Sequence, residues 1–136
     1  MSVLIRWIVV GVYAALVTRL SLAPSSSLKL FSKYIRFAHS DKVVHFAMYG
    51  VLAALLVWAF RVRATRVKTA LWVAGICVGY GLLMEILQIL LLPGDRHFCL
   101  VDVTANTAGA VASVLLLSLW AQSHAAERLN GEADRE

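Results

Sequence analysis

Charged residues are scarce in this chain of 136 residues. Lys, Arg, Asp and Glu together make up 15% of the sequence, whereas 60% of it is hydrophobic. Soluble domains usually carry about 25% charged and about 45–50% apolar residues. Because the excess apolar residues form long uninterrupted runs, the composition excludes an ordinary soluble domain. It predicts an integral membrane protein with one compact domain.

Cysteine and the common catalytic motifs are also scarce. The two cysteines, Cys77 and Cys99, cannot form a disulfide framework, and we expect both to be free at different membrane depths. The sequence has no glycine-rich phosphate loop and no nucleophile elbow. The net charge of +5 arises from basic residues at the ends of apolar runs, so it favours lipid phosphate over nucleic acid as the partner.

Four apolar runs dominate the sequence, at residues 7–22, 43–60, 69–92 and 103–120. A helix needs roughly 20 apolar residues to cross a bilayer. We therefore predict an all-α membrane protein, a four-transmembrane-helix bundle in residues 1–122, followed by a polar and flexible tail in residues 123–136. For the first run the competing interpretation is a signal peptide, because residues 21–23 resemble a cleavage site. Arg19 and Pro24 argue against cleavage.

The segment between the first two runs has two helical faces. Its apolar residues are Leu28, Phe31, Ile35 and Ala38, and its basic residues are Lys29, Lys33 and Arg36. The segment is too charged to cross a membrane. We predict a short amphipathic helix over residues 28–39 that lies in the headgroup region, with a solvated loop as the alternative.

Small residues recur in the third and fourth runs. Gly75 and Gly79 form a small-xxx-small pair with Gly81 nearby, and Ala105, Gly109 and Ser113 repeat every four residues. Such ridges let helix backbones approach closely in membranes. We expect this approach within one chain rather than between two copies.

Four spans place both ends of the chain on one side of the membrane. The basic residues of that side are Arg6, Arg61, Arg63, Arg66, Lys68, Arg128 and Arg135. Those of the other side are Arg19, Lys29, Lys33, Arg36, Lys42 and Arg96. The totals are nearly equal, but the dense cluster at 61–68 lies in a short loop, which places the termini in the cytoplasm.

The same topology brings polar residues together. The second span begins, the third ends and the fourth begins at one membrane face, and these places carry Asp41, Lys42, His45, Tyr49, Glu85, Gln88, Arg96, Asp102 and Asn106. Spacings of three and four put the members from each run on one side of a helix. Because an isolated charge at mid-membrane costs about 2.5–3.5 kcal/mol, we expect these groups to meet and nearly neutralise each other.

Glu85 and His45 are the expected acid/base pair, since an intramembrane acid indicates function and histidine titrates near neutral pH. The alternative is structural: Glu85 bonded to Gln88, Arg96 or Asn106 or paired with Lys42, and His45 bonded to Asp41 or Asp102. A metal site from His45, Glu85 and Asp102 is chemically feasible, but one histidine without a close-spaced ligand pair favours none. The sequence indicates no particular cofactor.

The remaining cluster residues are expected to bind a ligand. Arg96 and Lys42 suit a phosphate or carboxylate, with Asp41, Tyr49, Gln88, Asp102 and Asn106 around them. The alternatives are structural. Arg96 would pair with Asp102 or Glu85, and Tyr49 would be an interfacial aromatic or a hydrogen-bond partner. Asp41 would be a helix cap, Lys42 a snorkelling cation, and Asp102 and Asn106 cap or helix contacts.

In this order, the motifs resemble the VanZ-like family over about residues 5–120. The matching pieces are D-K-x-x-H-F-x-x-Y at 41–49, E-x-x-Q at 85–88, R-x(5)-D-x-x-x-N-x-x-G at 96–109 and, more weakly, S-x-x-P at 21–24. Three residues after Arg96, where a small polar residue is expected, this chain has Cys99. The resemblance implies a bacterial multi-pass protein of the cell envelope, in a family whose founder is associated with teicoplanin resistance.

Three functions fit these features. The first is binding of a membrane lipid or a lipid-linked envelope precursor through its anionic headgroup. The second is an intramembrane enzyme that acts on such a lipid through Glu85 and His45. The third is a small proton-coupled transporter, although the polar groups gather at one face instead of lining a path across. The sequence leaves the oligomeric state open.

Overall fold

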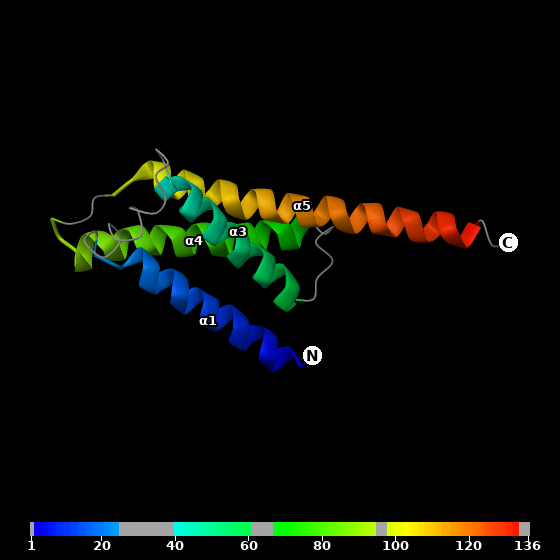
Figure 1. Ribbon diagram of the computed structural model, residues 1–136, viewed down its shortest axis with the longest axis horizontal. Helices are drawn as coiled ribbons and strands as arrows, with labels where there is room; N and C mark the ends of the chain where they lie inside the picture. The colour runs from blue at the N-terminus through cyan, green and yellow to red at the C-terminus, as the bar shows by residue number, and fades with distance from the viewer. Residues whose placement is uncertain (1, 25–39, 61–66, 95–97, 134–136) are drawn as a thin grey trace.

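The computed structural model describes residues 2–24, 40–60, 67–94 and 98–133. Over these ranges it has four helices, α1 (Val3–Ser21), α3 (Ser40–Phe60), α4 (Val67–Leu91) and α5 (Leu100–Ala133) (Figure 1). Each is long and apolar enough to cross a membrane. The predicted all-α fold with four membrane-spanning helices is therefore confirmed. The amphipathic helix predicted over residues 28–39, with Lys29, Lys33 and Arg36, lies outside the described residues.

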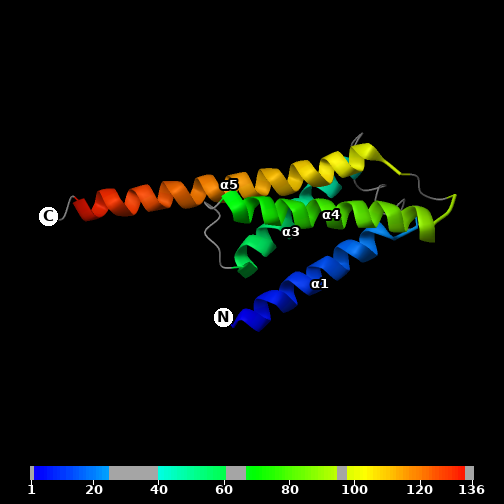
Figure 2. The same cartoon turned by 180° about the vertical axis from the view of Figure 1, so that it is seen from behind.

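The helices do not end where hydrophobicity ends. α1 begins at Val3, before its apolar run, and the Ser2 hydroxyl accepts a hydrogen bond from the Ile5 backbone N–H at 3.4 Å. α5 continues past Trp120 to Ala133, so its 34 residues span roughly 50 Å at ~1.5 Å per residue. This exceeds a hydrocarbon core of ~30 Å, and Figures 1 and 2 both show α5 projecting beyond the other helices. The flexible tail at 123–136 stays a prediction.

α3 is the central helix of the bundle and contacts α1, α4 and α5. In both views α1 and α4 end at the same end of the bundle at which α3 and α5 begin (Figures 1 and 2). The opposite end carries both chain termini. The start of α3, the end of α4 and the start of α5 therefore meet at one end of the bundle, as predicted for spans that alternate in direction. The end of α1 lies there too.

The interior is apolar over most of its length, with buried residues from all four helices. Leu52, Ala53 and Leu56 of α3 lie in one cluster with residues that include Val17, Val73, Cys77, Ala110 and Val114. The outside is apolar as well: Leu4, Leu71, Trp72 and Leu116 are each between 67% and 73% exposed. A bundle whose interior and outer surface are both apolar suits lipid surroundings, because exposing so much apolar surface to water is unfavourable.

Close backbone approach occurs between α3 and α5. A Cβ atom added at Gly109 would overlap the Phe46 carbonyl oxygen, and one added at Gly50 would lie 3.3 Å from the Gly109 carbonyl oxygen. The predicted smooth ridge around Gly109 is thus a packing surface. The approach predicted within one chain at Gly75 and Gly79 is wrong, because no described atom lies within 4 Å of a Cβ placed at either residue.

Candidate functional site

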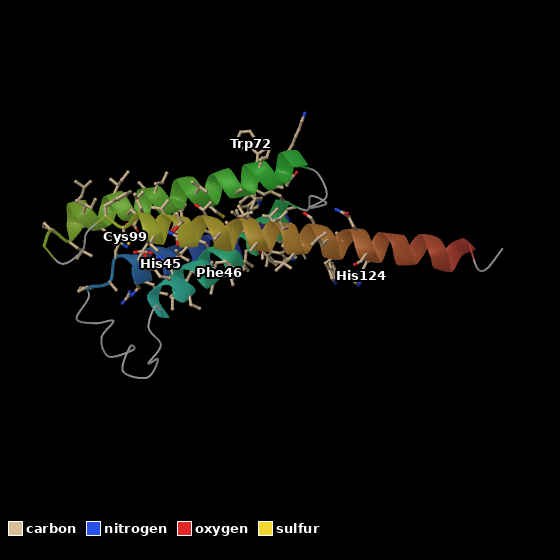
Figure 3. The ribbon with its side chains drawn as sticks, turned by 90° about the horizontal axis from the view of Figure 1, so that it is seen from above. His45, Phe46, Trp72, Cys99 and His124 are labelled. Atoms are coloured by element: carbon tan, nitrogen blue, oxygen red, sulfur yellow. The ribbon has the colours of Figure 1, made fainter. Side chains whose placement is uncertain are left out.

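Five polar side chains from three helices are buried, with Ser21 of α1, at the end of the bundle where α3 and α5 begin. His45, Glu85, Gln88, Asp102 and Asn106 come from α3, α4 and α5, and each is 8% exposed or less. We call these five, together with Lys42, the polar cluster. Figure 3 places His45 and Cys99 at this end and Trp72 and His124 toward the other. Polar groups at membrane depth are costly, so their burial together marks a site.

Two side-chain contacts join α3 to α5. Lys42 forms an ion pair with Asp102, and its ammonium nitrogen also lies 3.7 Å from the Cys99 sulfur. One helical turn further along, the His45 Nδ1 lies 3.1 Å from the Asn106 Oδ1. Because an amide oxygen only accepts, this contact assigns the hydrogen to Nδ1. The motif spacings explain why these two pairs form. Lys42 and His45 are three residues apart on one side of α3, and Asp102 and Asn106 are four residues apart on the side of α5 that faces it.

Glu85 joins α4 to the start of α5. Its Oε2 accepts a hydrogen bond of 3.1 Å from the Cys99 backbone N–H. Cys99 in turn accepts bonds through its carbonyl from the backbone N–H groups of Asp102 and Val103, at 2.9 and 3.3 Å. Cys99 therefore caps α5, and Asp102 lies in the first turn, where a negative charge complements the helix dipole. The cap that was one alternative for Asp102 therefore lies three residues earlier, at Cys99.

The charges around Glu85 form a single electrostatic unit. Asp102, His45 and Lys42 all lie near enough to act on the Glu85 carboxylate. Lys42 forms an ion pair with Asp102 and also acts electrostatically on Glu85, the partner that the sequence offered as an alternative. Lys42 lies at the exposed edge of the cluster, which we call its mouth: the Lys42 side chain is 29% exposed and the Asp102 side chain 10%.

A hydrogen bond between Gln88 of α4 and Ser21, the last residue of α1, joins these two helices. The Gln88 side-chain amide donates a 3.0 Å hydrogen bond to the Ser21 carbonyl oxygen. The Glu85–Gln88 bond was one structural alternative; in the structure Glu85 accepts from Cys99, just before α5, and Gln88 donates to α1. Ser21 was not expected at the site, although it begins the S-x-x-P motif.

Tyr49 lies below the cluster and is fully buried. Gly81 of α4 faces it closely: an added Cβ would lie 3.3 Å from the Tyr49 ring and 3.2 Å from the Asn106 amide nitrogen. The neighbouring Tyr80 hydroxyl donates to the Ala14 carbonyl oxygen at 2.7 Å and lies 2.5 Å from the Thr18 hydroxyl. Tyr80 is therefore committed to holding α1 against α4.

The structure thus gathers Lys42, His45, Tyr49, Glu85, Gln88, Asp102 and Asn106 at one end of the bundle. Asp41 belongs to α3, but its side chain lies outside the described part of the molecule, as does Arg96. Cys99 is a further site residue that sequence reasoning missed, although it stands three residues after Arg96 inside the matched motif. The catalytic and ligand-binding roles of the gathered residues stay predictions.

Metal ligands are not arranged at the site as described. Among the side chains that the structure describes, which do not include Asp41, no group of three His, Cys, Asp or Glu could hold a metal ion. Both cysteines are free thiols, with Cys77 buried and Cys99 partly exposed.

Comparison with known proteins identifies the family of this chain. No curated protein and no solved structure matches the chain. Residues 5–121, however, match the family model described as VanZ/LLP1. The match includes all six polar-cluster residues and Cys99, and it covers most of the chain. This multi-pass membrane protein therefore belongs to the VanZ/LLP1 family.

Proposed function

We propose that this chain binds the anionic headgroup of a lipid, or of a lipid-linked envelope precursor, at its polar end. The protein resides in the bacterial cytoplasmic membrane with both termini in the cytoplasm, so the polar cluster faces outward. Through this binding it acts on the cell envelope, including the response to glycopeptide antibiotics such as teicoplanin.

The observation that carries the proposal is the Lys42–Asp102 ion pair at the mouth of a buried polar cluster. Lys42 is the more exposed partner, so an incoming phosphate or carboxylate oxygen can replace Asp102 beside its ammonium group. Arg96 and three cations of segment 28–39 adjoin α5 and α3 in the sequence. Cations near a membrane surface attract anionic lipid by about 1 kcal/mol each.

Lipid binding to purified protein in neutral-lipid nanodiscs tests this proposal. The test variant replaces Lys29, Lys33, Arg36 and Arg96 by alanine, and its matched control replaces Arg61, Arg63, Arg66 and Lys68. Both variants lose four positive charges, but at opposite ends of the bundle. We expect the test variant to bind added anionic lipid at least about tenfold more weakly, with little change in the control. Equal affinity in both would refute headgroup binding at the polar end.

A second candidate function is acid/base catalysis on the bound lipid. It is favoured by the surroundings of Glu85, a nearly fully buried acid within electrostatic range of His45. The protein would be incubated in liposomes of total bacterial lipid, and changed headgroups would be sought by mass spectrometry. Product formation that disappears in Glu85→Gln supports catalysis. Product levels equal to those of protein-free liposomes exclude it for these lipids.

A further inference from the structure

Two hydroxyl groups at the polar end are buried without a hydrogen-bond partner in the described part of the chain. They belong to Tyr49 and Ser21, which are 0% and 5% exposed. In contrast, His45, Glu85, Gln88, Asp102 and Asn106 each have a partner. Native proteins satisfy nearly all buried polar groups, so an unsatisfied one calls for a specific explanation.

The surroundings of the Tyr49 hydroxyl restrict what can satisfy it. The hydroxyl lies within electrostatic range of Glu85, Cys77 and Tyr80. The ring centroids of Tyr49 and Tyr80 are 6.2 Å apart, and the Tyr80 hydroxyl already bonds to α1. Glu85 uses Oε2 to accept from the Cys99 N–H, and its other carboxyl oxygen offers a second acceptor. The Tyr49 donor and the Glu85 acceptor thus lie in the same region of the interior.

Depth separates Tyr49 from the anion-binding end of the cluster. Tyr49 is seven residues beyond Lys42 on α3, which corresponds to about 10 Å along the helix. A second anion at that depth would be repelled by the Glu85 carboxylate. A neutral hydroxyl group avoids the repulsion, because it can donate to Glu85 and accept from Tyr49 at once.

Ser21 repeats this situation one helical turn along α4. Gln88, three residues after Glu85, holds the Ser21 carbonyl oxygen, while the Ser21 hydroxyl stays unpartnered among the described groups. Ser21 therefore lies against α4 one turn after Glu85, and its hydroxyl, like that of Tyr49, has no partner among the described groups. Two such hydroxyls at the polar end suit a ligand that offers more than one hydroxyl group.

We infer that Tyr49 and Glu85, extended by Ser21, form a binding site for neutral hydroxyl groups beneath the anion-binding end. The hydroxyl comes from water or from a hydroxylated headgroup whose anionic part lies at Lys42. The headgroup source rests on the proposed function, whereas the water source does not. If the headgroup supplies it, the ligand class narrows to phosphate esters that carry a polyol or a sugar.

Lipid selectivity tests the headgroup source. Phosphatidylglycerol and phosphatidylinositol carry headgroup hydroxyls, whereas phosphatidylmethanol has the same single charge and none. We expect the wild-type protein in neutral-lipid nanodiscs to prefer the hydroxylated lipids by about threefold or more. Tyr49→Phe should abolish the preference, so that the hydroxylated lipids bind no more tightly than phosphatidylmethanol. Tyr13→Phe is the matched control, because the Tyr13 hydroxyl already donates to the Met48 carbonyl oxygen at 3.2 Å.

Solid-state NMR tests the water source. Magnetisation transfer from water to the ring carbon that bears the Tyr49 hydroxyl is measured without anionic lipid, with the Tyr49→Phe spectrum as assignment control. Fast transfer supports a bound water, and a Tyr49-dependent lipid preference supports a headgroup hydroxyl. Slow transfer together with no such preference overturns the inference. If no anionic lipid binds at all, the proposed function fails, and the water measurement alone decides this site.

Discussion

The Glu85 carboxylate of α4 accepts a hydrogen bond from the Cys99 backbone N–H, immediately before α5 begins. A side chain buried in one membrane helix thereby fixes the start of another. Lys42 of α3 reaches the same place through Asp102 and the Cys99 sulfur. Three helices are thus held together at one end by polar contacts, in surroundings where apolar contacts with lipid offer little preference for any particular arrangement.

Substitution of Glu85 separates its hydrogen bond from its charge. Glutamine keeps an oxygen that can accept from Cys99, whereas alanine leaves that N–H without a partner. We expect Glu85→Ala to lower the free energy of unfolding by about 1–3 kcal/mol and Glu85→Gln to lower it much less. Unfolding in mixed detergent micelles measures both. Equal losses would show that the Cys99 contact does not contribute to stability.

Disruption of the Lys42–Asp102 pair should be asymmetric. Asp102 is the more buried partner, so Lys42→Ala leaves a carboxylate without its cation, while Asp102→Ala leaves a lysine that can turn toward the surface. We expect Lys42→Ala to cost about 1–3 kcal/mol, more than Asp102→Ala, and the double variant to recover part of the loss. A double-mutant cycle in the same unfolding assay provides the test. Additive losses would contradict direct pairing.

Glycine substitutions distinguish the packed helix faces from the open ones. At Gly109 an added methyl group meets the backbone of Phe46, which cannot rotate away, so α3 and α5 must separate. We expect Gly109→Ala to destabilise the bundle by about 3 kcal/mol, at the upper end for overpacking. Gly75→Ala and Gly79→Ala meet nothing within 4 Å and should change stability by no more than about 1 kcal/mol. The reverse order would place α4 in the wrong rotation.

These glycines show where sequence reasoning fails. α4 carries apolar side chains on all of its faces, so its hydrophobic pattern does not reveal which face points inward. The small-xxx-small spacing of Gly75 and Gly79 indicates that a close approach is permitted there, not that it occurs. Gly81 touches Tyr49 and Asn106 instead. The rotation of a helix depends on all its neighbours, and a local pattern does not contain it.

The site was more predictable than the packing. Helix number followed from run length, and the meeting of His45, Glu85 and Asn106 followed because consecutive spans alternate in direction. The partners did not follow, because several side chains of similar reach compete within a few ångströms. Lys42 selected Asp102, and Glu85 selected a backbone N–H. Likewise, hydrophobicity marks where a span ends but not where its helix ends, so the continuation of α5 to Ala133 was not foreseen.

Thiol labelling tests which side of the membrane the polar end faces. Cys99 is partly exposed, whereas Cys77 is fully buried among apolar residues. With the termini in the cytoplasm, a membrane-impermeant maleimide added to intact bacterial cells should label the wild-type protein and the Cys77→Ser variant. The Cys99→Ser variant should stay unlabelled, because its remaining thiol is inaccessible. Labelling that requires permeabilised cells would reverse the proposed orientation and turn the headgroup site toward the inner leaflet.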